Sequence, residues 1–84
     1  MFLGWYDPDK KWPARAKLAD AVARYIEKFG IQPEVCLTNV TDAAELAADQ
    51  EAPDLLVRGV SYIPRFTFYV GVDDSAEEAL PAAA

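Results

Sequence analysis

The pattern of apolar and polar positions is clearest between Leu55 and Val72. In the second half of this stretch the two kinds of side chain alternate. One side carries Phe66, Phe68, Val70 and Val72, and the other carries Arg65, Thr67 and Tyr69. A strand places successive side chains on opposite faces. The alternation therefore predicts a strand over residues 65–72, with one apolar face against a core.

Three more segments are predicted to be strands: residues 1–6, 34–40 and 55–60. Residues 1–6 are apolar at both odd and even positions, which is typical of a strand in the interior of a sheet. Gly59 in the third strand indicates a bulge or a close approach by another backbone. The fourth strand, after Pro64, is predicted most simply to pair antiparallel with the third.

Two segments are predicted to be helices. Over residues 13–29 apolar side chains recur at helical spacing, with a proline in the first turn and Gly30 where a C-terminal cap is expected. A second, shorter helix is expected from Thr41 or Asp42 to about residue 50. Its N-terminus has a possible capping box, because Glu45 follows Asp42 by three residues.

The predicted fold class is therefore α/β, with the order β-α-β-α-β-β. Short turns between strand, helix and strand favour parallel crossovers. We expect a four-stranded mixed sheet with the two helices packed on one face, as a two-layer sandwich. Helices on both faces, as in a thioredoxin-like core, are the alternative. Residues 1–74 would form a single domain, and residues 75–84 an acidic, alanine-rich flexible tail.

The length of 84 residues is that of one domain with a small core. No apolar run approaches the roughly 18 residues of a membrane span, and no signal peptide is recognisable. A single cysteine, Cys36, cannot form an intramolecular disulfide, and it is expected to be a small buried apolar group. These features lead us to expect a cytoplasmic protein.

The chain carries a net charge of −6 and contains no histidine. An acidic domain repels nucleic acid, so DNA or RNA binding is not favoured. The absence of histidine removes the commonest general base and the commonest metal ligand. The glycines are isolated from one another, so no phosphate-binding glycine loop is present. No cofactor and no catalytic residue are therefore predicted.

The first candidate site is the loop from Asp7 to Trp12. In open α/β sheets, ligands bind beyond the carboxyl ends of parallel strands. This loop would meet the segment 39–42 there. Carboxylates of Asp7, Asp9 and Asp42 could hold Mg²⁺, or helix N-termini with nearby cations could hold an anion. The cations in question are Lys10, Lys11 and Arg15. The simpler interpretation is a turn followed by a helix cap.

The second candidate site is a surface on which aromatic and cationic side chains are interleaved. Such a surface suits a protein interface, and less well a nucleic acid. The predicted binding residues are Trp12, Arg15, Arg58, Tyr62, Arg65 and Tyr69. The alternative is that they are scattered over the surface without a shared role.

The segment from Val57 to Gly71 resembles the region around the cis-proline of thioredoxins, where Ile-Pro leads into an apolar strand that ends in glycine. The resemblance implies a cis peptide bond at Pro64 and a position of Pro64 opposite the start of the first helix. The Cys-x-x-Cys of that family is missing near residues 9–13, so a redox function is not implied. An ordinary hairpin with Pro64 in its loop would explain the same residues.

Taken together, the sequence favours a small non-catalytic cytoplasmic domain that binds another protein or itself, as a homodimer. The alternative is a ligand- or metal-binding domain, possibly an enzyme, that uses the Asp7–Trp12 loop at the carboxyl edge of the strands. Neither alternative involves a membrane.

Overall fold

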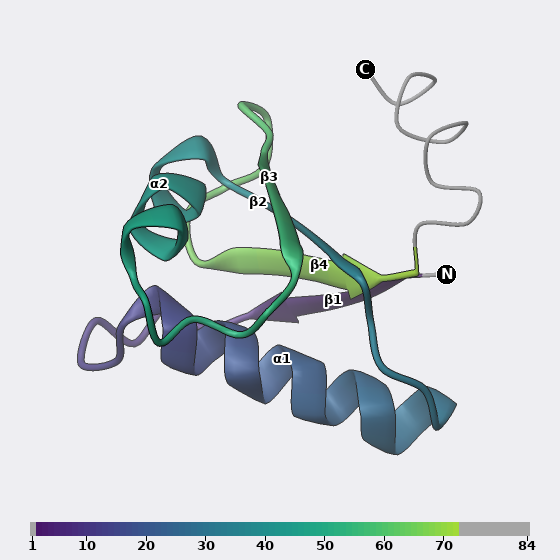
Figure 1. The fold of residues 1–84 in the computed structure, drawn as a ribbon. Coiled ribbons are helices and arrows are strands. Elements are labelled where there is room, and N and C mark those ends of the chain that lie inside the picture. The colour runs from purple at the N-terminus through teal and green to yellow at the C-terminus, as the bar shows by residue number, and fades with distance from the viewer. Residues whose placement is uncertain (1, 73–84) are drawn as a thin grey trace.

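The structure is a computed structural model, and it describes residues 2–72. Its elements follow the predicted order, with four strands and two helices (Figure 1). Their bounds are β1 Phe2–Tyr6, α1 Ala14–Phe29, β2 Val35–Thr38, α2 Val40–Ala48, β3 Leu56–Gly59 and β4 Thr67–Gly71. The predicted tail, residues 75–84, lies outside the described residues.

The four strands form one mixed sheet in the order β1-β4-β2-β3. The last strand, β4, lies between β1 and β2 and is antiparallel to both, whereas β3 is parallel to β2. Strands β1 and β2 therefore run in the same direction but are not neighbours. Their carboxyl ends and the start of β4 meet at one edge of the molecule, and this edge carries the site described below.

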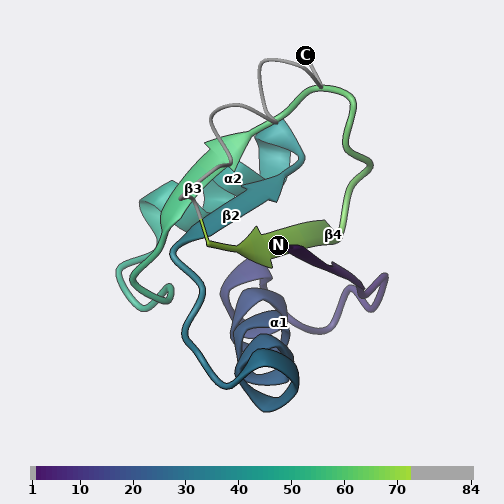
Figure 2. The same cartoon turned by 90° about the vertical axis from the view of Figure 1, so that its right-hand side faces the viewer.

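Both helices pack on the same face of the sheet, which confirms the two-layer arrangement. Helix α1 lies against β1 and β4, and α2 lies against β2 and β3 (Figures 1 and 2). The main core contains side chains from both helices and from one face of the sheet. Its fully buried members include Leu18 and Tyr25 of α1, Cys36 of β2, and Phe68 and Val70 of β4.

Helix α1 ends as the sequence predicts. Gly30 adopts the left-handed conformation, with φ 75°, and its N–H donates to the carbonyl of Ile26. At the other end Pro13 is the N-cap residue, one position before the helix proper. The buried face of the helix does not coincide fully with its apolar positions, because Ile26 is 37% exposed while Lys17 is buried.

Helix α2 approaches β3 closely at Gly59. A Cβ atom at Gly59 would lie 3.0 Å from the Cα of Val40, at the start of α2. This confirms the prediction of a close backbone approach at this glycine. The cap of α2 is Asn39, whose side-chain oxygen accepts a hydrogen bond from the Thr41 N–H. The predicted capping box is wrong, because the carboxylates of Asp42 and Glu45 bind other segments of the chain.

Two predictions about the sheet are wrong. Strand β1 is an edge strand, because β4 takes the interior position beside it. Strands β3 and β4 do not form a hairpin, because β2 lies between them and the connection over residues 60–66 passes the end of β2. The apolar pattern of a strand indicates which of its faces are covered, but it does not select the neighbouring strand, so both errors have the same origin.

Strand β4 begins at Thr67, two residues later than predicted. Phe66 is the one non-glycine residue with a positive φ, 66°, within the described residues. Because of this conformation the extended backbone of β4 begins only after Phe66. Arg65 therefore lies before the strand and does not occupy the predicted outward position on it. All peptide bonds in residues 2–72 are trans, including the bond before Pro64. The thioredoxin-like alternative therefore gains no support from this segment.

Candidate functional site

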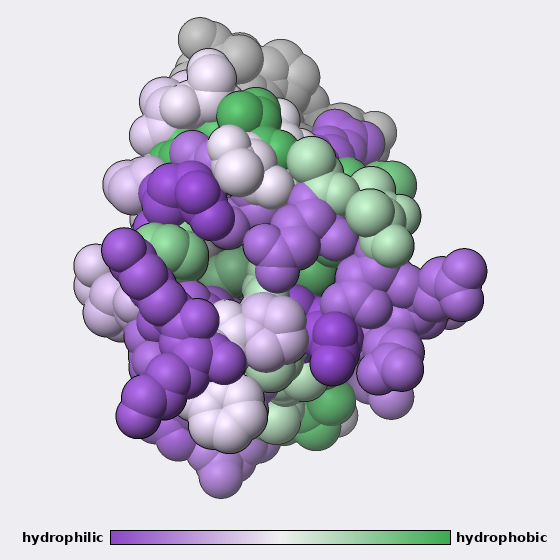
Figure 3. Space-filling view, turned by 90° about the vertical axis from the view of Figure 1, so that its left-hand side faces the viewer, coloured by the Kyte–Doolittle hydropathy of each residue, from purple (hydrophilic) through white to green (hydrophobic). Residues whose placement is uncertain are grey.

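A pocket of about 550 Å³ lies where the carboxyl ends of β1 and β2 meet the start of β4. On this side of the molecule hydrophilic side chains surround a hollow with less polar atoms at its base (Figure 3). The pocket is lined by Lys10, Lys11, Trp12, Pro13, Ala14, Lys17, Asp42, Glu45, Arg65 and Phe66. It therefore contains four cationic and two anionic side chains.

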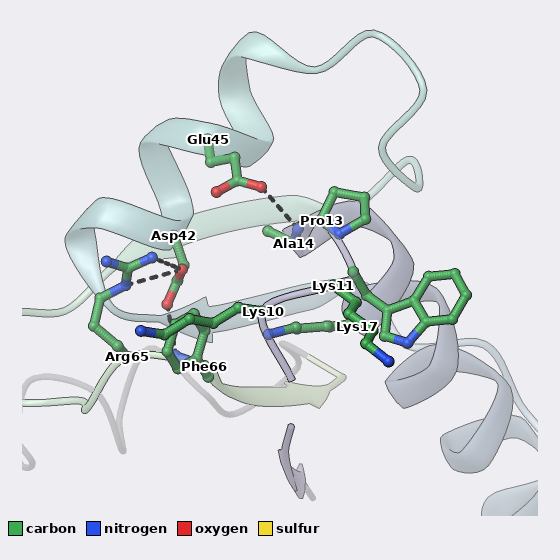
Figure 4. Close-up of a pocket in the computed structure, with 10 residues that line it drawn as sticks. Lys10, Lys11, Pro13, Ala14, Lys17, Asp42, Glu45, Arg65 and Phe66 are labelled. Atoms are coloured by element: carbon green, nitrogen blue, oxygen red, sulfur yellow. Dashed lines mark hydrogen bonds and ion pairs between the residues drawn. The ribbon is translucent and has the colours of Figure 1, made fainter. Parts of the chain in front are cut away.

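Asp42 is a pocket residue whose carboxylate has hydrogen-bond donors on both oxygens. It lies in the first turn of α2, is 1% exposed, and uses both carboxylate oxygens. Its Oδ1 accepts from Nε of Arg65 at 3.1 Å and from Nη2 at 3.0 Å, and its Oδ2 accepts from the Phe66 N–H at 2.8 Å (Figure 4). The hydrogen-bonding capacity of this buried carboxylate is therefore largely satisfied by the chain itself.

These contacts hold the strained segment before β4 in place. The Asn39 side chain, which caps α2, also donates to the carbonyl of Ile63 at 2.8 Å. Together with Asp42 it fixes both ends of the segment 63–66. A positive φ at a phenylalanine costs free energy, and it persists only where surrounding contacts compensate. The contacts from α2 provide this compensation at Phe66.

Glu45, the second acidic residue of α2 in the pocket, also binds another segment of the chain. Oε2 of Glu45 accepts a hydrogen bond from the Ala14 N–H at 2.8 Å, at the start of α1 (Figure 4). The N-terminus of a helix favours an anion, because free N–H groups and the helix dipole point there. Pro13 provides no side-chain cap, so Glu45 does so from another element.

Lys17 is the unusual residue of the pocket. Its side chain comes from α1, it is 1% exposed, and its Nζ has no hydrogen-bond partner among the described residues. Nζ lies 4.0 Å from the centroid of the Phe66 ring, and the Arg65 guanidinium lies 4.7 Å from the same centroid. The ring compensates part of the desolvation of the ammonium group. Its three N–H donors stay unsatisfied.

Lys10, Lys11 and Trp12 belong to the loop between β1 and α1. Two turns shape this loop: the Asp7 carboxylate accepts from the Asp9 N–H at 3.0 Å, and the Asp9 carboxylate accepts from the Lys11 N–H at 2.9 Å. Both turns agree with the simpler interpretation of this sequence. The two lysines are exposed and extend the positive charge of the pocket toward solvent.

The predicted metal site is not assembled. Within residues 2–72 no group of three or more potential ligands comes together. Asp7 and Asp9 are used in the turns of the loop, and Asp42 is held by Arg65 and by the Phe66 N–H. Arg65 is paired with Asp42, so the cationic side chains of the pocket without a carboxylate partner among the described residues are those of Lys10, Lys11 and Lys17.

The six predicted binding residues do not form one surface. Trp12 and Arg65 line the pocket, whereas Arg15 pairs with Asp49. The distance from Nη1 of Arg15 to Oδ2 of Asp49 is 2.9 Å, and the hydrogen bond from Arg15 lowers the pKa of Asp49. The other three, which do not line the pocket, are Arg58, Tyr62 and Tyr69.

Tyr69 and Arg58 lie on the face of the sheet that the helices do not cover. The register places Gly4, Tyr69, Leu37 and Arg58 in one row across the four strands. Part of this open face is covered by the chain itself, because Ile63 and Val60 pack on Val35 and Leu37. Elsewhere on this face Tyr69 is 39% exposed and Tyr6 is 64% exposed. Tyr62 is exposed on the segment 60–66.

Cys36 is buried in the core of the sheet, as expected for a small apolar group. Burial raises the pKa of its thiol to about 12. The thiol is therefore neutral at physiological pH, and nucleophilic chemistry at this position is disfavoured.

Comparison with protein-family models, curated proteins and solved structures finds no match to this chain. Neither helix within residues 2–72 combines the length and apolar character needed to cross a membrane. The arguments about function therefore rest on the pocket and on the open face of the sheet.

The sequence predicts a site at the loop 7–12, and Lys10, Lys11 and Trp12 of this loop line the pocket, but the sequence does not single out Lys17 and Phe66, which line it too. The residue type of Lys17 does not distinguish it from the other charged side chains of this helix, most of which are exposed. A weak signal for its burial is its position in the helix beside Leu18 and three residues after Ala14, both of which are apolar and buried. Phe66 was assigned to the apolar face of the last strand, and no local signal predicts its positive φ.

Proposed function

We propose that this domain binds a small anionic ligand in the pocket between α1, α2 and the start of β4. The observation that carries the proposal is the Lys17 ammonium group, which is buried without a hydrogen-bond partner in a pocket with two further lysines. This is the ligand-binding alternative that the sequence left open, with an anion in place of a metal ion.

The free-energy cost of burying Lys17 favours a role in anion binding over a purely structural role. Burying a cation costs several kcal/mol unless it is paired, and the ring of Phe66 offsets only a part of this cost. The nearby carboxylate of Asp42 already accepts hydrogen bonds from Arg65 and from the Phe66 N–H, and it forms an ion pair with Arg65. An oxyanion in the pocket would accept from the Lys17 ammonium group and compensate its desolvation.

The surroundings would add to the attraction. Lys10 and Lys11 lie at the rim, and α1 directs its N-terminus toward the same region. The chain as a whole carries a charge of −6, so this local positive region contrasts with the rest of the molecule. A compact anion can use such a local site, whereas a long polyanion would also meet the acidic surface.

The test is a titration of the full chain with inorganic phosphate, at constant ionic strength, followed by NMR shifts of backbone amides. We expect saturable shifts at Ala14, Lys17 and Phe66, and a rise in melting temperature with phosphate concentration. Lys17→Met should abolish both effects. The matched control is Lys28→Met, which removes one charge from the far end of the same helix.

Two results would contradict the proposal. One is the absence of saturable shifts with phosphate, sulfate and carboxylates at millimolar concentration. The other is an equal loss of binding in the Lys17→Met and Lys28→Met variants, because this would indicate an effect of net charge and not of the pocket.

A second candidate function is self-association through the open face of the sheet. The row of Gly4, Tyr69, Leu37 and Arg58 favours it, because a sheet face with exposed aromatic groups suits association with a second copy. Light scattering over a concentration series would test this candidate. A dimer that dissociates on Tyr69→Asp supports it, and a monomer at all concentrations rejects it.

We also propose a cytoplasmic location, which agrees with a chain that has one cysteine, buried and uncharged at neutral pH. Fractionation of the source cells would test this proposal, and recovery with the membranes or outside the cell would contradict it.

A further inference from the structure

We infer that the anion is the phosphate group of a phosphate monoester attached to a flat ring, as in a nucleoside monophosphate. This inference rests on the proposed anion-binding function and specifies its ligand class. Three properties of the pocket carry it: the balance of charge, the volume, and the position of Trp12.

The charge of the lining matches a dianion. Four cationic side chains against two carboxylates leave two positive charges. Arg65 is neutralised by Asp42, and Glu45 is held by the Ala14 N–H, which leaves the lysines as the cations without a carboxylate partner at the pocket. A phosphate monoester carries about 1.5 to 2 negative charges at neutral pH, whereas a carboxylate carries one. The monoester is thus the better match.

The volume leaves room for a ligand larger than a free phosphate ion. A pocket of about 550 Å³ falls within the range of small-molecule sites, about 300 to 1,000 Å³. Lys17 lies buried deep in it, and the exposed Lys10 and Lys11 lie at its rim. A phosphate group at Lys17 would leave the outer part of the pocket for the moiety that carries it.

Trp12 is one of the two aromatic residues that line the pocket. It is 58% exposed and is followed in the lining by Pro13 and Ala14, whose side chains are apolar. The other aromatic ring of the pocket, Phe66, is already in contact with the cations of Lys17 and Arg65. The indole is therefore the ring that stays available for stacking, and flat bases stack well on such surfaces.

The experiment compares four ligands by titration calorimetry: inorganic phosphate, ribose 5-phosphate, adenosine monophosphate and adenosine. We expect the nucleotide to bind at least about tenfold more tightly than ribose 5-phosphate, and adenosine to bind weakly. Trp12→Ala should remove the difference between the two phosphate esters but keep phosphate binding. The control is Tyr6→Ala, which removes another exposed aromatic side chain, on the open face of the sheet.

The outcomes of these titrations distinguish a failure of the ligand class from a failure of the proposed anion binding. If ribose 5-phosphate and the nucleotide bind equally, the flat-ring inference is wrong and anion binding stands. If none of the phosphates binds, the proposed function itself is wrong. If a single-stranded oligonucleotide with a 5′-phosphate binds much more tightly than the mononucleotide, with a strong dependence on salt, the ligand is a nucleic acid and the small-molecule class is rejected.

Discussion

The two sides of the pocket differ in how a buried charge is compensated. On the α2 side Asp42 is 1% exposed and accepts hydrogen bonds from the guanidinium of Arg65 and from a backbone N–H. On the α1 side Lys17 is also 1% exposed, but its ammonium group contacts the ring of Phe66 and has no hydrogen-bond acceptor among the described residues. Both charges lie within the same small pocket (Figure 4).

The difference separates a structural charge from a charge available for binding. Removing one partner of a satisfied buried pair leaves uncompensated groups behind, so such a pair contributes to the stability of the native fold. An unpaired buried charge has the reverse property, because the fold would be more stable without it. Asp42 should therefore matter for stability, and Lys17 for ligand binding.

The largest effect is expected for Asp42→Ala. It leaves the Phe66 N–H without its acceptor and removes the partner of Arg65, next to a residue with φ 66°. We expect the free energy of unfolding to fall by about 2 kcal/mol, mainly because the Phe66 N–H loses its acceptor, since the Arg65 side chain is 45% exposed and stays hydrated. Urea unfolding monitored by circular dichroism measures it. Glu27→Ala, in an exposed ion pair with Arg24, is the control and should change stability little. A loss as small as that of the control would show that the segment 63–66 does not depend on Asp42.

The second prediction is that Lys17→Met increases the stability of the fold, in contrast to Asp42→Ala. Lys17→Met keeps the length of the side chain and removes the buried charge, so we expect the free energy of unfolding to rise by about 1 kcal/mol in phosphate-free buffer. The same urea experiment measures this change. A decrease would mean that the contact with Phe66 is net stabilising, and the contrast between Lys17 and Asp42 would then fail.

Local features of the sequence were sufficient for the elements and for much of the core. Alternation identified Phe68 and Val70, both fully buried, and Gly30 marked the end of α1. These features depend on neighbours in the chain. The position of β4 between β1 and β2 does not, because the same alternation would suit a hairpin with β3.

The pocket was harder to predict for the same reason. Asp42 and Glu45 have the spacing of a capping box, yet their partners lie 24 and 31 residues away in the chain, at Phe66 and Ala14. Lys17 follows the charged pattern of an exposed helix face, and only the tertiary contact with Phe66 removes it from solvent. Interactions at such separations depend on the strand order, which the sequence pattern leaves undetermined.

A third prediction concerns a buried group that stays neutral. Burial raises the pKa of the Cys36 thiol from its ordinary 9.0 to about 12. Above pH 9 the unfolded chain loses this proton while the folded chain keeps it, so stability falls as pH rises toward 12. We expect a contribution of about 1 kcal/mol at pH 10. Urea unfolding at pH 8 and pH 10 measures the change in wild type and in Cys36→Ala, in which this part of the decline should vanish. Equal declines in the two proteins would show that the thiol is not desolvated, since other titrating groups are common to both.

The smallest effect is expected at the surface, where charges are paired but hydrated. The hydrogen bond from Arg15 lowers the pKa of Asp49, so the stability that this pair contributes is present above the ordinary pKa of the carboxyl group. It is lost as the pH falls through the lowered pKa and Asp49 becomes protonated. Arg15→Ala should therefore destabilise the protein slightly at pH 7, less than Asp42→Ala, and not at all once the carboxyl group is protonated. A double-mutant cycle with Asp49→Asn, measured by urea unfolding from pH 7 down to pH 3, isolates the pair. A coupling as large as that between Asp42 and Arg65 would break the comparison, because burial would then not be what makes a charge pair matter in this fold.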